Sequence, residues 1–227
     1  VPANSGQLWR IVAARITQAT NVTTTSVVSS ENPSLIDDSV TFTATIAGGS
    51  PLAGSNVTFK DGSTVLGSVV LAYGQTTASI STSTLSAGWH SITAAFSGDA
   101  INVGSSGLLM QQVLWPFTGF FAPIANLPTL NSVKAGSSIS VKFSLGGDRG
   151  LAILAAGSPV SLAIDCATGA PLDAGQPTMT AGGSGLQYLD GVYAYVWKTD
   201  KTWAGTCREL RVTLVDGSTH TADFQFK

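Results

Sequence analysis

The chain has 227 residues, a formal net charge of -2, and only 11% charged residues against 44% hydrophobic ones. Ordinary soluble domains carry roughly 25% charged residues, so Ser, Thr, Gly, Asn and Gln must supply much of this surface. That composition is typical of an extracellular β protein, and it offers no basic patch for nucleic-acid phosphates. No apolar run approaches the roughly 18 residues of a membrane span. The length suits two β domains of about 100 residues each.

Residues 1–20 differ from the rest and are predicted to be a short N-terminal extension. The start at Val1 has no signal-peptide pattern, so we expect a mature form or a fragment. Gln7–Val12 is consistent with one strand, and its Gly-x-Leu-Trp-Arg-Ile pattern resembles the closing blade strand of secreted, propeller-type sugar dehydrogenases. The alternative is a plain extension whose Trp9 packs on the domain that follows.

Residues 21–114 are predicted to form a first β-sandwich. Ser39–Ala47 alternates, which places Val40, Phe42, Ala44 and Ile46 on one face of a strand. Asp61-Gly62 is a hairpin turn between two further strands. The other strands are expected at Val22–Ser29, Val57–Phe59, Val65–Leu71, Thr76–Ser81, Trp89–Phe96 and Gly107–Leu114. About seven short alternating strands at this spacing predict an Ig-like sandwich.

Two segments of this region, Gly54–Gly67 and Leu85–Ala100, resemble the bacterial Ig-like repeat domains of secreted and cell-surface proteins. The pattern departs from that family after Gly98-Asp99, where the next residues lack the common aromatic. Such modules act as spacers, adhesive arms or enzyme appendages. The resemblance therefore argues against catalysis in this chain.

Residues 115–227 are predicted to form a second β domain. Ile139, Val141, Phe143 and Leu145 share one face of a strand that ends at Gly146-Gly147-Asp148. Three segments resemble the domain named for a Pro-x-Lys-Phe (PxKF) signature, found at the C-terminus of secreted actinobacterial proteins: Gly119–Pro123, Lys134–Asp148 and Trp197–Arg208. Here Ser140 stands in place of the signature proline. The family has no established activity, and its usual position implies the C-terminal end of a larger polypeptide.

Both cysteines, Cys166 and Cys207, fall in this second domain. We favour a disulfide because the rest of the chain has the character of a secreted protein. Two buried thiols are the alternative, whereas a metal site would lack ligands because no His lies nearby. Closing a loop of this length stabilises a fold by about 4 kcal/mol in the chain-entropy model.

The junction between the domains has no Gly/Ser linker. Aromatic residues run straight through it, and flexible linkers are polar, so we expect these rings to be buried at or beside the junction and to hold the domains in a preferred orientation. They are Trp115, Phe117, Phe120 and Phe121.

Candidate catalytic residues are sparse. The two histidines, His90 and His220, lie in different predicted domains and are expected to be solvated strand-edge residues, and no Gly-x-Ser-x-Gly elbow occurs. Asp37-Asp38 precedes a strand and is expected to be a solvated turn, with a weak Ca²⁺ contact as the alternative. Asp99, Asp148, Asp190 and Asp216 lie in Gly-containing turns, where Asp is favoured for turn geometry alone. We predict no catalytic residue, cofactor or metal ion.

Tyr193, Tyr195 and Trp197 alternate along one strand, so their rings share a face, as a sugar-stacking platform requires. The intervening Val192, Ala194 and Val196 are apolar as well, which favours a strand buried on both faces. We favour core packing and keep the glycan platform as an alternative.

The sequence thus predicts an all-β chain of two consecutive Ig-like β-sandwich domains after a short N-terminal extension. The favoured function is a non-catalytic extracellular spacer or interaction appendage at the C-terminus of a larger secreted bacterial protein. The alternatives are a carbohydrate-binding module and the tail of a secreted enzyme whose catalytic part is absent. Expected partners are the upstream domains and a cell-surface glycan or protein. We expect a monomer, secreted or associated with the cell surface, that binds no nucleic acid and has no membrane span.

Overall fold

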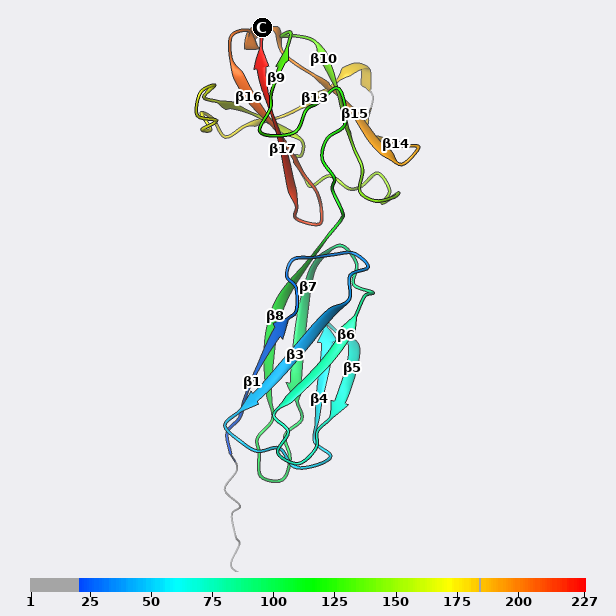
Figure 1. The fold of residues 1–227 in the computed structure, drawn as a ribbon, viewed down its shortest axis with the longest axis vertical. Coiled ribbons are helices and arrows are strands. Elements are labelled where there is room, and N and C mark those ends of the chain that lie inside the picture. The colour runs from blue at the N-terminus through cyan, green and yellow to red at the C-terminus, as the bar shows by residue number, and fades with distance from the viewer. Residues whose placement is uncertain (1–20, 184) are drawn as a thin grey trace, which may run out of the picture.

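A computed structural model describes residues 21–183 and 185–227. The strand expected at Gln7–Val12 lies outside them. The described residues form two β bodies placed end to end, residues 21–114 at the bottom of the view and residues 115–227 at the top (Figure 1). We call these the first and second domains. The all-β class and the sandwich architecture are confirmed, and among the described residues no helix is long and apolar enough to cross a membrane.

The first domain contains two sheets that enclose one core. One sheet has the order β1-β3-β6 and the other β2-β8-β7-β4-β5. The strands are β1 (Thr24–Ser29), β2 (Ser34–Leu35), β3 (Val40–Ala47), β4 (Asn56–Asp61), β5 (Thr64–Val70), β6 (Thr77–Thr82), β7 (Gly88–Phe96) and β8 (Ser105–Leu114). Their bounds follow the predicted strands closely, and β2 is the addition.

Alternation decides which side chains fill this core. Val40, Phe42, Ala44 and Ile46 of β3 are all buried, as predicted. The opposite face of β3 carries hydroxyls, and these pair across the strands: Thr41 with Ser81 at 2.8 Å and Thr43 with Ser79 at 2.9 Å. Each such cross-strand pair contributes roughly 0.2–1 kcal/mol. Paired hydroxyl groups thus supply part of the polar surface that the few charged residues cannot provide.

The N-terminal segment of the first domain runs parallel to β8. Asn21 forms a parallel bridge with Asn102 before β8 begins, and β2 pairs in parallel with the end of β8. Side-chain hydrogen bonds join the same two segments between the Asn21–Asn102 bridge and the β2–β8 pairing. The Gln111 amide donates to Glu31 O, and the Asn32 amide donates to Met110 O. The segment is therefore fastened to β8 near both ends.

The second domain also has two sheets around one core. One sheet has the order β12-β11-β16-β17-β9, and in the other β15 pairs with β10, β13 and β14. The strands are β9 (Leu130–Val133), β10 (Ser138–Phe143), β11 (Val160–Ile164), β12 (Gln176–Pro177), β13 (Met179–Thr180), β14 (Gln187–Leu189), β15 (Val192–Lys198), β16 (Cys207–Thr213) and β17 (Thr219–Phe226). Two 3₁₀ turns, η1 (Ala181–Gly183) and η2 (Lys201–Trp203), complete it.

Aromatic rings dominate the core of the second domain. Trp197 of β15 meets Phe224 and Phe226 of β17 edge to face, with ring centroids 5.3 and 6.1 Å apart. Such pairs add about 0.5–1.5 kcal/mol each beyond their buried area. The two sheets are thereby joined through their middle strands.

Candidate functional site

The aromatic row of β15 belongs to the core, so the glycan platform is wrong. Tyr193, Tyr195 and Trp197 have exposed fractions of 0%, 4% and 0%. The Tyr193 hydroxyl accepts from Arg149 N at 2.5 Å, and the Tyr195 hydroxyl donates to Thr178. Burial raises the pKa of both phenols. A sugar cannot stack on these rings because β16 and β17 of the opposite sheet cover them.

The histidines are not solvated edge residues, and that expectation is also wrong. The ring of His90 is 8% exposed and bridges Asp61 Oδ2 and Ser86 O, each at 2.7 Å. Asp61 opens the β4–β5 hairpin turn, so His90 fastens that hairpin to the segment before β7. This accounts for a histidine in the core without any catalytic role.

His220 lies in a group that contains the residue types of a hydrolase triad but not its geometry. Ser218 Oγ donates to Asp216 Oδ1 at 2.6 Å and lies 3.1 Å from His220 Nε2. In a triad the base lies between the acid and the nucleophile, whereas here the hydroxyl occupies the middle and its proton is committed to the carboxylate. His220 instead stacks on Phe117, with centroids 3.6 Å apart. Burial lowers the pKa of this imidazole, and Asp216 acts in the opposite direction.

The predicted turn acids serve the backbone. Asp38 Oδ2 accepts from Leu35 N at 2.9 Å. Burial acts to raise the pKa of Asp99, but hydrogen bonds from Leu52 N, the Asn102 amide and the following backbone outweigh it and hold that pKa at about 2. Asp148 accepts from Gly150 N, and Asp190 has a φ of 50°. Among the residues described, no group of three or more His, Cys, Asp or Glu side chains is placed to hold a metal ion.

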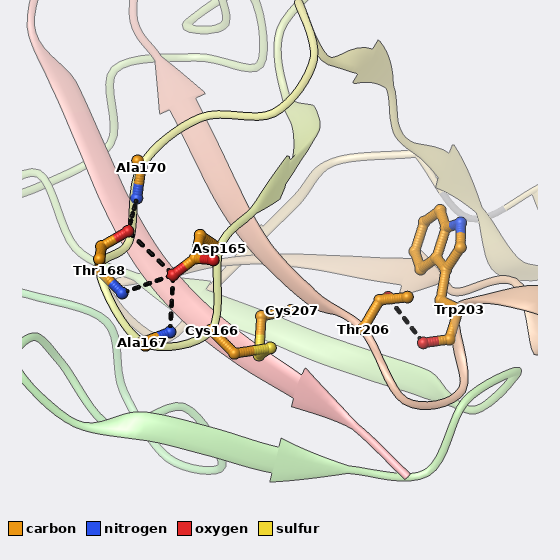
Figure 2. The surroundings of a disulfide bond; sticks show 8 residues. All are labelled: Asp165, Cys166, Ala167, Thr168, Ala170, Trp203, Thr206 and Cys207. Carbon is orange, nitrogen blue, oxygen red and sulfur yellow. Dashed lines mark hydrogen bonds between the residues drawn. A yellow bond between two sulfur atoms is a disulfide. The ribbon is translucent and has the colours of Figure 1, made fainter.

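The cysteines form a disulfide that ties the loop after β11 to the start of β16 (Figure 2). Asp165 organises that loop: its carboxylate accepts from Thr168 N at 2.8 Å, from the Thr168 hydroxyl at 2.9 Å and from Ala167 N at 3.0 Å. These bonds, the one from Thr168 N foremost, lower the pKa of Asp165. The loop is therefore held by a covalent bond on one side and by a carboxylate turn on the other.

The junction aromatics pack on the second domain and not between the two domains. Phe120 belongs to the core of the second domain, and Trp115 and Phe117 pack against that same core. Phe121 lines a cavity of about 450 Å³ on the outer face of the sheet, together with Lys142 and Leu189. Trp115, Phe117 and Phe120 thus enlarge the core of the second domain, to which β10 and β17 also contribute.

A polar contact joins the two domains instead. Asp216 is 0% exposed, and its carbonyl accepts from Gln112 Nε2 of the first domain at 3.1 Å. Its Oδ2 accepts at 2.8 Å from the backbone N of Trp115, the first residue of the second domain. Beside it Gly217 has a φ of 87°, and a Cβ there would lie 2.7 Å from Gln112 Nε2 and 3.0 Å from Trp89 Nε1. We expected Asp216 only to shape a turn. Its role at the junction depends on Gln112, 104 positions away in the first domain, which no local pattern signals.

Trp203 of η2 is a half-buried aromatic residue to which sequence analysis gave no role. It lies between two cavities, one of about 430 Å³ and one of about 390 Å³. Lys198, Asp200, Lys201 and Met179 line the first, and the disulfide lines the second. Figure 2 shows the indole beside the disulfide-bonded start of β16. Both concavities have the size of ligand sites, about 300–1,000 Å³.

Comparison with known proteins finds a family match for the first domain. Residues 24–113 match the family model described as a bacterial Ig-like domain (group 3). This confirms the Ig-like resemblance for that part of the chain, whereas the resemblance of residues 115–227 to the Pro-x-Lys-Phe domain stays a prediction. No curated protein matches the chain.

Several solved structures are similar at low identity. A protein named as membrane anchored, from Corynebacterium diphtheriae, is 16% identical with a TM-score of 0.36, over 89% of this chain and 58% of that one. The Yersinia pseudotuberculosis adhesin InvE gives the same four values. The fibronectin(III)-like modules of Clostridium thermocellum CbhA are 17% identical, with a TM-score of 0.29, over 88% of this chain and 94% of theirs. Similarities this weak carry no conclusion about function.

Proposed function

We propose that the chain is a non-catalytic extracellular spacer and interaction appendage of a larger secreted bacterial protein. The observation that carries this proposal is the placement of the two domains in line. β1 begins at the lower end of the molecule, and the C-terminal residue lies at the opposite end (Figure 1). A module whose chain enters at one end and leaves at the other holds whatever precedes it away from whatever it touches.

Three features support the extracellular and bacterial parts of the proposal. The match of residues 24–113 to bacterial Ig-like domains is one. The disulfide is the second, because such bonds persist in oxidising compartments. The third is the hydroxyl-rich, weakly charged surface. The position at the C-terminus of a larger, actinobacterial polypeptide is part of the proposal and rests on the resemblance of residues 115–227 to the Pro-x-Lys-Phe domain.

The non-catalytic part rests on the chemistry of the candidate residues. The ring of His90 is hydrogen-bonded to Asp61 of the β4–β5 hairpin. His220 stacks on Phe117, and the Ser218 hydroxyl donates to Asp216 instead of to the histidine. The acids named in sequence analysis accept backbone hydrogen bonds or sit in turns. None of these groups has the nucleophile, base and orienting acid in the order that acyl transfer needs.

Small-angle scattering of the whole chain tests the spacer geometry. We expect a monomer whose distance distribution has the long tail of two bodies in line. A compact distribution, with the domains folded against each other, would contradict the spacer. A panel of polysaccharide and ester substrates tests the second half of the proposal, and turnover that survives further purification would overturn it.

A further inference from the structure

The larger of the two cavities at Trp203, of about 430 Å³, lies at the end of the second domain that faces away from the first domain. Gly205 N donates to Phe226 O and Phe226 N donates to Thr206 O, which places the residues after Trp203 beside the C-terminal strand end. That end is the far pole of the molecule (Figure 1). An appendage that makes contact with its target at its tip would do so here.

The indole of Trp203 is held rigidly. The guanidinium of Arg208 lies 4.2 Å from the ring centroid, and Arg208 is itself 7% exposed and donates to Ser161 Oγ at 2.8 Å. The ring also meets Phe226 edge to face, with centroids 5.4 Å apart. Trp203 Nε1 has no acceptor in the described part of the chain. A ring that is already fixed binds a ligand at a lower ordering cost than a mobile one.

The charged groups of the cavity favour an acidic ligand. Lys198 Nζ donates to Gly136 O at 3.0 Å and keeps two further donor hydrogens, and Lys201 packs on the same glycine. Asp200 is the one carboxylate in the lining. Its Oδ1 accepts from Thr202 N and the Thr202 hydroxyl, each at 2.8 Å, and these bonds lower its pKa. The lining therefore contains two lysines and one carboxylate, which retains a second oxygen.

The lining is amphipathic as well as cationic. Pro177, Met179 and Trp203 supply apolar surface, next to Lys198 and Lys201. A sugar ring carries apolar C–H faces and hydroxyl groups, and an acidic sugar adds a carboxylate or phosphate that lysine binds strongly. The free oxygen of Asp200 is an acceptor for a sugar hydroxyl.

We propose that this cavity binds an acidic sugar unit of a polysaccharide, with Trp203 against the ring and Lys198 and Lys201 on the anionic group. The proposal rests on the non-catalytic appendage proposed above and names the class of its ligand. The site is distinct from the β15 row, whose rings are in the core.

Calorimetric titration of the whole chain tests this site with polygalacturonate as the carboxylate polymer, poly(glycerol phosphate) as the phosphate polymer and dextran as the neutral one. We expect at least one anionic polymer to bind and dextran not to bind. The double variant Lys198→Gln/Lys201→Gln should weaken binding about tenfold or more, as expected for lost charge-assisted hydrogen bonds. Trp203→Phe, which keeps a ring but removes Nε1, should weaken it less.

The matched control is Lys60→Gln/Lys142→Gln, which removes the same charge away from the cavity. We expect it to change the affinity by less than about twofold, because screening limits distant charges. Equal losses in the two double variants would show non-specific attraction and overturn the site, as would the absence of binding to both anionic polymers. Neither result bears on the proposed spacer function. Cleavage of a polymer, in contrast, would overturn the non-catalytic role without contradicting the binding site.

Discussion

Asp223 on β17 shows how a single buried charge opposes the fold. It pairs across the sheet with Glu209 of β16, and its Oδ1 is buried without a hydrogen-bond partner among the described residues. Burial first, and then the charge of Glu209, raise the pKa of Asp223. Glu209 itself is paired with Arg211, 2.7 Å away. An ionised Asp223 is thus left without compensation, and it destabilises the second domain at neutral pH.

Asp223→Asn should therefore increase the free energy of unfolding at about pH 7, by up to about 1 kcal/mol. The folded-state pKa lies above the unfolded one, so the gain is present at neutral pH and disappears as the pH falls toward the unfolded value, where the carboxyl is neutral in both states. Urea denaturation across this range measures it. Asp190→Asn, in an exposed turn, is the control, and an equal gain there would refute the explanation.

His220 predicts a pH dependence of the opposite sign. Burial lowers the pKa of this imidazole, with Asp216 opposing, so its contribution to stability is complete above the unfolded pKa and is lost as the pH falls. His220→Phe preserves the stack on Phe117 and removes the titration. Between about pH 7.5 and pH 5.5 the variant's second domain should lose less stability than the parent's, measured by urea midpoints. Parallel midpoint curves for the two proteins would rule this out.

The segment that the Cys166–Cys207 disulfide closes, which includes β12 to β15, depends on a covalent bond for its stability. Replacing both cysteines by alanine should lower the free energy of unfolding of the second domain by about 2–4 kcal/mol, because the unfolded chain regains the freedom of the closed loop. Two-transition denaturation measures this loss, with the first domain's transition as internal control. A loss below about 1 kcal/mol, or one confined to the first domain, would contradict it.

Sequence alone predicted the elements where alternation was one-sided. The strand at Val40–Ala47 alternates apolar with Thr, so its extent and its buried face followed directly. In β15 both faces are apolar, which favoured core packing over a glycan platform, and the burial of all three rings confirms that preference. The strands β12, β13 and β14 are two or three residues long, too short for a period to register. The sequence did not indicate that Trp203 lines two cavities, because segments distant in sequence form them.

At the scale of the whole molecule, a hydrogen bond joins the two domains, because Gln112 Nε2 donates to Asp216 O at 3.1 Å. Gln112→Ala removes the bond from Gln112 Nε2 to Asp216 O and leaves both cores intact. Each domain should keep its stability within about 0.5 kcal/mol, while the spread of interdomain orientations increases. Residual dipolar couplings, fitted to each domain separately, measure that spread. Thr93→Ala is the control, and unchanged alignment tensors in Gln112→Ala would show that the linker alone fixes the angle.

The fastening of the N-terminal segment to β8 determines how the first domain responds to mechanical load. If the ends of the chain are pulled apart, residues 21–36 and β8 slide past each other in opposite directions. The hydrogen bonds that residues 21–36 make with the chain around β8 are then loaded in shear. They share the force and must rupture together, instead of breaking one after another. Single-molecule pulling should show one high rupture peak for this domain, lowered in Asn32→Ala, which loses two of those bonds. A tether between a cell and its surroundings would remain folded under such strain.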